Sequence, residues 1–225
     1  MDLDPVFIRD GLIIFILLVV SIIFHEWGHA VMADLLGDDT PRSEGRVTLD
    51  PRSHLDLVGT VLIPLVNIFV FRGGFNFIGW GKPVVTNPSN YANRQRDDVL
   101  VSLAGPAANL LVALVAIVAG AFIVAAHPRL GELVYGLVVM NVGLAVFNLI
   151  PLPPLDGATL LRRVVGMSEA TYHGIARWSG LVMLVLINLS ATRQIIGYLV
   201  GEACIPYAVL CNWINPSAFR VIFAS

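Results

Sequence analysis

Residues 11–30 read GLIIFILLVVSIIFHEWGHA, an apolar run with one serine that is followed by two histidines on either side of a glutamate. The apolar segment extends to Leu36 and stops before Gly37, a residue type that commonly follows a helix end. At 1.5 Å per residue, a helix over residues 11–36 would be about 39 Å long, enough to cross a hydrocarbon core of about 30 Å. His25 would lie about 17 Å from the Leu36 end of that helix. The polar triplet is therefore predicted to lie inside a bilayer.

The composition also indicates an integral membrane protein. Of the 225 residues, 56% are hydrophobic and 13% are charged, against about 25% charged residues in soluble domains, and the mean hydropathy is +0.78. The net charge of -2 gives no sign of a nucleic-acid partner. The amino-terminal residues MDLDPVFIRD are acidic, whereas a cleavable signal peptide begins with basic residues. We therefore expect the first apolar segment to remain in the mature fold and the chain to form one membrane domain over residues 1–225.

Further apolar segments predict an all-α polytopic membrane protein with about five or six transmembrane helices. Residues 55–71 are apolar but contain Pro64 and are short for a crossing, so we expect a membrane-associated re-entrant segment there. Alternating residues near Phe75 to Val85 suggest a short β-hairpin. The other predicted spans are residues 99–126, 133–150 and 175–189, with a final irregular segment, either spanning or interfacial, over 194–210.

His25 and His29 are four residues apart, so they project from one face of a helix and can bind one metal ion. Glu26 lies close enough to the same face to act on a water held by that ion. Catalytic zinc usually has three protein ligands and an open fourth position, so one more ligand is required. Ionisable groups at bilayer depth cost about 2.5–3.5 kcal/mol each on insertion scales and are functional by default. The alternative is a buried polar network or proton relay between helices.

Asp156 is the candidate for the third ligand. It follows the prolines of NLIPLPPLDG, residues 148–157, where the backbone cannot stay helical. Non-helical backbone at membrane depth is tolerated where it is buried in protein or lines a wet cavity. Taken alone, an aspartate before a glycine is also typical of a turn. Beside the histidine pair, a carboxylate on this broken segment is better interpreted as a ligand.

The chain resembles the site-2 protease family of intramembrane zinc metalloproteases, in its compact bacterial or archaeal type without a PDZ domain. The resemblance rests on HEWGH inside an apolar span and on NLIPLPPLDG about 120 residues later, which matches the family pattern at Asn148, Pro151, Pro153, Asp156 and Gly157. The stretches GWGKPV and AGPAANLL also resemble compact bacterial members. One departure is Ala158, where many relatives carry a second glycine.

The resemblance implies one zinc ion per chain, held by His25, His29 and Asp156, with Glu26 as the catalytic base. It implies a peptide hydrolase that cleaves within or near the transmembrane segments of other membrane proteins, with a catalytic core over about residues 11–165. Its partners would be transmembrane substrates and the lipid bilayer.

Other polar residues carry weaker predictions. Asn148 and Asn109 are amides within spans, and either could support an unwound substrate or the oxyanion, or simply bond helix to helix. The hairpin near Phe75 to Val85 could pair with an extended substrate. His54 could gate the site, although a loop histidine beside acidic residues is usually solvated. Cys204 and Cys211, about 10 Å apart on a continuous helix, are predicted to be packing thiols.

The basic residues predict the orientation. His29 and Asp156 both lie towards the carboxyl ends of their spans, so the first and fourth spans should run in the same direction, and the third in the opposite one. By the positive-inside rule, the face holding most of the loop arginines is cytoplasmic, which puts the amino terminus outside and the metal site nearer the cytoplasm. The basic residues on that face are Arg42, Arg46, Arg52, Arg72, Lys82, Arg94, Arg96, Arg162, Arg163 and Arg177.

Two other classes of function remain as alternatives. A non-enzymatic metal-binding membrane carrier or helper protein could use the same ligands, but it would not need a carboxylate such as Glu26 beside the first histidine. A proton-coupled transporter would predict internal symmetry between the two halves of the chain, and the sequence does not display it.

Overall fold

The computed structural model describes residues 4–72 and 79–223, and this part of the chain is helical, with no β-strand in it. Five of the helices described are long and apolar enough to cross a membrane, which confirms the predicted fold class. In chain order the helices are α1 Pro5–Leu35, α2 Thr40–Ser43, α3 Pro51–His54, η1 Leu57–Leu62, α4 Ile63–Phe69, η2 Pro88–Asn90, α5 Arg94–Ile123, η3 Pro128–Leu130, α6 Gly131–Asn148, α7 Asp156–Val164, α8 Glu169–Asn188, α9 Ser190–Ile214 and α10 Pro216–Phe223.

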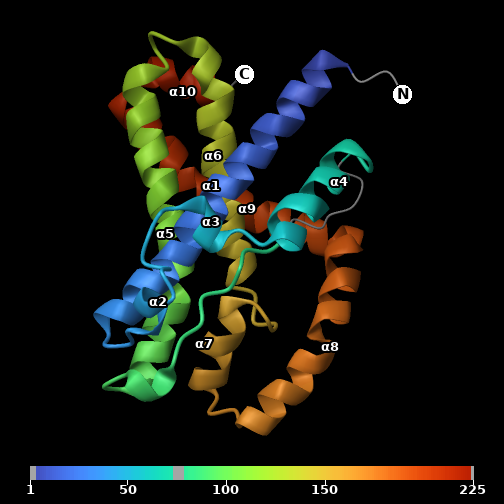
Figure 1. Ribbon diagram of the computed structural model, residues 1–225. Helices are drawn as coiled ribbons and strands as arrows, with labels where there is room; N and C mark the ends of the chain where they lie inside the picture. The colour runs from blue at the N-terminus through green and yellow to red at the C-terminus, as the bar shows by residue number, and fades with distance from the viewer. Residues whose placement is uncertain (1–3, 73–78, 224–225) are drawn as a thin grey trace.

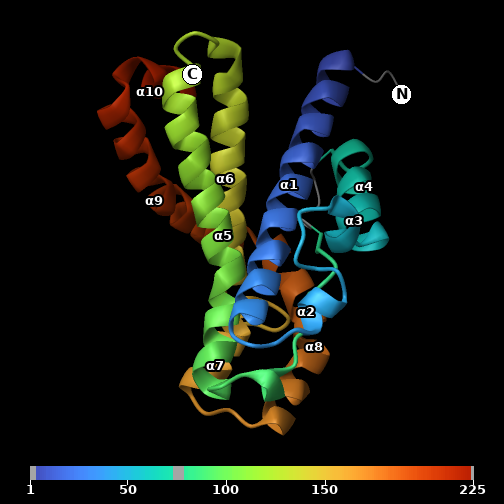
Figure 2. The ribbon, with the colours of Figure 1, turned by 60° about the vertical axis from the view of Figure 1, so that its left-hand side comes forward.

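Three long helices, α1, α5 and α6, form the centre of the molecule and contact one another pairwise. Figure 2 shows α5 and α6 running side by side, with α1 alongside them. The chain runs in the same direction through α1 and α6 and in the opposite direction through α5 (Figures 1 and 2). The carboxyl ends of α1 and α6 therefore lie towards the same end of the molecule, as their predicted shared depth requires.

Capping residues place the helix starts earlier than hydropathy alone predicted. α1 begins at Pro5 instead of residue 11 because the Asp4 side chain accepts a hydrogen bond from Val6 N at 3.0 Å. α5 begins at Arg94 instead of residue 99, after Asn93, whose side chain accepts from Arg96 N at 3.1 Å. The added residues of α5, 94–98, are all polar, whereas those of α1, 5–10, include both apolar and charged residues.

The short apolar segment over residues 57–69 forms a π-helical turn, η1, continued by α4. At 1.5 Å per residue it is about 20 Å long, which is too short to cross a hydrocarbon core of about 30 Å. Asp56 begins it by accepting hydrogen bonds from Val58 N at 3.0 Å and Gly59 N at 2.6 Å. Of the predicted hairpin, residues 73–78 lie outside the described residues. The described remainder, residues 79–85, is extended but forms no strand.

The carboxyl-terminal helices α9 and α10 pack against α5 and α6 and form a second hydrophobic cluster with them. α9 continues through Pro206 as one helix, where the sequence suggested an irregular segment. Its Cys211 is buried and free, in a cluster with residues of α5, α6 and α10, as predicted for a packing thiol. The buried members of the cluster are Ala113, Ile117, Ala121, Val124, Val138, Val142, Cys211, Ala218 and Ile222.

Candidate metal centre

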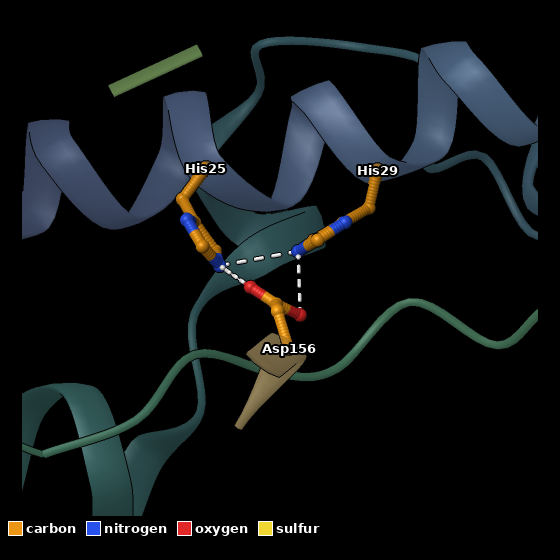
Figure 3. A group of neighbouring side chains, drawn as sticks. All are labelled: His25, His29 and Asp156. Atoms are coloured by element: carbon orange, nitrogen blue, oxygen red, sulfur yellow. Dashed lines mark hydrogen bonds and ion pairs between the residues drawn. The ribbon is translucent and has the colours of Figure 1, made fainter. Parts of the chain in front are cut away.

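His25, His29 and Asp156 come together from two helices (Figure 3). Both histidines are buried and project from α1, while Asp156 is the first residue of α7. His25 Nε2 lies 3.3 Å from Asp156 Oδ2, and His29 Nε2 lies 3.4 Å from Asp156 Oδ1. The two Nε2 atoms are 3.1 Å apart. Four-coordinate zinc with bonds of about 2.1 Å holds its ligand atoms about 3.4 Å apart, so the spacing of these donors suits zinc.

Hydrogen bonds on the far side of each ring aim the lone pairs inward. The Nδ1 atom of His29 lies 2.7 Å from the carbonyl oxygen of Val101, and that of His25 lies 2.7 Å from Asn109 Oδ1. Because both partners are oxygens that accept, each neutral ring carries its proton on Nδ1 and presents a bare Nε2. Among the described residues, Asp156 Oδ2 is buried without a hydrogen-bond partner. Lone pairs that converge in this way suit a bound cation, so the three side chains form a candidate metal site.

Two glycines leave room for this arrangement. A Cβ atom on Gly105 of α5 would overlap Nε2 and Cε1 of His29. A Cβ atom on Gly157 would overlap the carbonyl oxygens of Leu149 and Ile150, because the chain after α6 folds back tightly on itself. Gly157 therefore permits the turn that brings Asp156 to the histidines.

Glu26 lines a cavity of about 400 Å³ together with the three candidate ligands. An extended segment, residues 79–87, forms one wall, to which it contributes Trp80 and Thr86. Asn148 and Thr159 also line the cavity. The cavity thus places a carboxylate beside the candidate metal position and an extended backbone beside both.

The extended segment 79–87 is held in place from behind. Arg46, which is only 3% exposed, donates hydrogen bonds to the carbonyl oxygens of Lys82 at 3.2 Å and Pro83 at 3.1 Å, and also to that of Ser53. Thr60 Oγ1 donates to Trp80 O at 2.7 Å. These bonds fix the cavity wall to Arg46 and to η1.

Asp38 anchors the far end of the same segment. Its carboxylate accepts hydrogen bonds from Asn87 N at 2.6 Å, from Thr40 Oγ1 at 2.6 Å and from Asn90 Nδ2 at 2.9 Å. Burial alone would raise the pKa of Asp38, but these hydrogen bonds outweigh it and hold the pKa below its usual value. Burial raises the pKa of the neighbouring Tyr91 to about 12. Asp38 is thus held in its charged form, and Tyr91 in its neutral form, at neutral pH.

Of the three residues with weaker predictions, Asn148 lies in the cavity and the other two lie elsewhere. Asn148 Nδ2 donates to Leu144 O at 2.9 Å while the side chain lines the cavity. Asn109 is fully buried behind His25, and its amide bonds to α1 and α6, which matches the helix-to-helix alternative left open for it. The gating prediction for His54 meets a difficulty. His54 is buried, its Nε2 donates to Thr48 O at 2.7 Å, and among the residues described it is not part of the cavity lining.

Sequence reasoning missed four residues that lie at the site or behind it: Ser21, Arg46, Gly105 and Asn141. Ser21 and Asn141 are polar residues inside apolar spans, and polar residues at such positions indicate a functional role. Arg46 lies in a polar loop, where an arginine carries no signal of burial.

A family model described as Peptidase family M50 matches residues 13–128 and 123–187. The chain belongs to peptidase family M50, the site-2 protease family. Both sequence motifs, and all three candidate ligands, lie inside the matched residues of this M50 peptidase.

Curated relatives of this M50 peptidase carry names of the same kind. It is 36% identical over 185 residues to "Putative zinc metalloprotease YwhC" of Bacillus subtilis, covering 76% of this chain and 78% of the relative. It is 31% identical over 175 residues to "Putative zinc metalloprotease Rip2" of Mycobacterium tuberculosis, covering 77% of this chain and 65% of the relative. It is also 31% identical over 189 residues to "Putative zinc metalloprotease Rip2" of Mycolicibacterium smegmatis, covering 80% of this chain and 70% of the relative. No solved structure matches the chain.

Proposed function

We propose that this M50 peptidase is a zinc endopeptidase that hydrolyses peptide bonds within or near the transmembrane segments of other membrane proteins. The observation that carries the proposal is the convergence of three side chains, with the two histidine Nε2 atoms 3.1 Å apart and each 3.3–3.4 Å from one oxygen of Asp156, while Glu26 lines the same cavity. The family membership and the names of the relatives support a peptidase that uses zinc. The catalytic core proposed is residues 11–165, within a single domain over residues 1–225.

In this proposal His25, His29 and Asp156 hold the zinc, and each has a defined task. The histidines bind through Nε2, with their rings oriented by Asn109 and by Val101 O. Asp156 adds a negative charge to the site. When bound, zinc acts as a Lewis acid that activates water and polarises the scissile carbonyl. Glu26 takes a proton from the attacking water and returns it to the leaving amine.

The substrate must be locally unwound, because a helix hides its carbonyl groups in its own hydrogen bonds. The extended backbone at residues 79–87 lies along the cavity and is a suitable surface for an unwound chain. Asn148 lines the cavity and is positioned to hold the substrate backbone or the oxyanion. The cytoplasmic orientation of the site, with the amino terminus outside, is proposed from the arginine distribution.

The test is cleavage of a tagged single-span membrane protein in reconstituted vesicles, comparing the native chain with Glu26→Gln at matched zinc content. The native chain should cut the reporter, and Glu26→Gln should bind zinc but cut at least about 100-fold more slowly, because a general base contributes about 10²–10⁴-fold. Chelation should abolish cleavage and added zinc should restore it. Equal cleavage by both proteins would remove Glu26 from the mechanism. Zinc binding without cleavage of any reporter in a varied panel would favour the metal carrier instead.

A further inference from the structure

A fully buried polar network lies behind His25, between the three central helices. It consists of Ser21 on α1, Asn109 on α5 and Asn141 on α6, and each of these residues is 0% exposed. Buried polar groups in an apolar region are costly unless their hydrogen bonds are complete. Two asparagines at such a depth therefore call for a reason beyond packing.

The hydrogen bonds that link the network share one direction of donation, which runs towards Ser21 and ends at Leu17 O. Ser21 Oγ donates to Leu17 O at 2.7 Å and accepts from Asn141 Nδ2 at 2.9 Å. Asn141 Nδ2 also donates to Leu137 O at 2.9 Å. Because Leu137 O can only accept, the nitrogen of the Asn141 amide must lie on this side. Asn141 Oδ1 is thereby turned towards Asn109.

The same direction of donation holds between Asn109 and the metal site. Asn109 Nδ2 donates to Asn141 Oδ1 at 2.8 Å and to Ser21 O at 3.0 Å. With both hydrogens of the amide used, Asn109 Oδ1 faces His25 Nδ1 at 2.7 Å and can only accept. His25 must then carry its proton on Nδ1 and present Nε2 towards His29 and Asp156.

We propose that Asn141 is a positioning residue that acts through Asn109 to hold His25 in its metal-binding tautomer and orientation. The inference rests on the metal site of the proposed function and deepens it. His29 is oriented by a backbone carbonyl, Val101 O, which the helix itself fixes. Asn109 is a side chain whose amide has two possible orientations, and two acceptors together select one of them. Ser21 O supplies the first acceptor from α1, and Asn141 Oδ1 supplies the second from α6.

Removing this control should weaken metal binding. Mutating a residue that hydrogen-bonds to a metal ligand typically lowers metal affinity by about 10–100-fold. We expect Asn109→Leu to lower zinc affinity by a factor within this range. Asn141→Leu should lower it by a factor near the lower end, about 10-fold. Because the two residues act in series, the double variant should bind zinc about as weakly as Asn109→Leu alone.

The experiment measures zinc affinity by chelator competition on the purified full chain in lipid nanodiscs. A matched control is Asn188→Leu, since Asn188 on α8 also donates to the carbonyl four residues earlier, Leu184 O at 2.8 Å, but is only partly buried. Ser21→Ala is a gentler second variant, because it removes only the hydroxyl that accepts from Asn141. It should shift zinc affinity in the same direction by a smaller factor.

A second readout separates positioning from stability. Nitrogen NMR of the metal-free chain labelled at histidine reports which ring nitrogen of His25 carries the proton, with the signal assigned by His25→Gln. The native chain and Asn188→Leu should show His25 protonated at Nδ1. Asn141→Leu and Ser21→Ala should show a mixture with the Nε2-protonated form.

The outcomes distinguish this inference from the proposed function. Native zinc affinity and an unchanged His25 tautomer in folded Asn141→Leu or Ser21→Ala would overturn the inference and leave the metal site intact. A lower unfolding temperature with both properties unchanged would show that the network only stabilises the fold. Failure of the native chain to bind zinc would overturn the proposed metal site itself.

Discussion

Gly81 lies directly against the carboxylate of Glu26. A Cβ atom on Gly81 would be 2.9 Å from Glu26 Oε1 and 3.1 Å from Glu26 Cγ. The extended segment 79–87 thus touches the candidate catalytic base as well as lining the cavity. The backbone of this segment holds the carboxylate from one side, where a larger residue would displace it.

Gly81→Ala should therefore slow cleavage while leaving zinc binding close to native. The added methyl group would press on both Ile22 Cγ2 and the Glu26 carboxylate, and a misplacement of about 1 Å can cost about 100-fold in rate. The measurement is kcat and bound zinc for the variant. Gly180→Ala on α8 is the control, since a Cβ atom there meets none of the described atoms within 4 Å. Native kcat in Gly81→Ala would show that Glu26 is not constrained by this contact.

Gly105→Ala should act on the metal instead of the base. The new methyl group would overlap the His29 ring at its metal-binding edge, so the ring must turn away. We expect zinc affinity to fall at least about 10-fold, as when a ligand loses its orientation. Chelator competition measures this, with Gly143→Ala on α6 as the control, where an added Cβ atom also meets nothing described within 4 Å. Equal affinities for the two variants would contradict the observed packing.

Arg46→Met should loosen the wall of the cavity. The substitution leaves the carbonyl oxygens of Lys82 and Pro83 without their charged donor, at a cost of about 1.5–3 kcal/mol for each such hydrogen bond. We expect a raised KM and a lower unfolding temperature, with zinc affinity unchanged. Arg52→Met is the control, because Arg52 is exposed and pairs only with nearby Asp50 among the residues described. If Arg46→Met has the native KM, residues 79–87 do not contribute to substrate binding.

Asp38 should contribute to stability in a manner that depends on pH. Its pKa in the folded chain is below its unfolded value of about 3.9. The contribution is therefore complete at neutral pH and is lost as the pH falls through the folded pKa. Unfolding temperatures between pH 7 and pH 3 should fall less steeply for Asp38→Asn, which should also be less stable at pH 7. The exposed neighbour Asp39, changed to Asn, should follow the native curve, and an Asp38→Asn curve parallel to the native one would refute the linkage.

The sequence alone was sufficient for most of the long apolar helices and for the identity of the candidate ligands. A helix in a bilayer must satisfy its own backbone hydrogen bonds, so an apolar segment of sufficient length is read directly as a span. The four-residue spacing of His25 and His29 puts them on one helix face whatever surrounds them. Asp156 followed from the need for a third ligand near a segment where prolines prevent a helix.

Tertiary structure decided what each of the other polar residues does. Asn109 could have faced the substrate or a neighbouring helix, and only the rotation and depth of α5 against α1 and α6 put it behind His25. Arg46 reaches two carbonyl groups 36 and 37 residues away along the chain, a contact that no local pattern encodes. Local geometry was therefore sufficient to choose the candidate ligands. The hydrogen-bond partner of a buried polar group depends on how separate helices pack against one another. That packing is defined only in the folded chain.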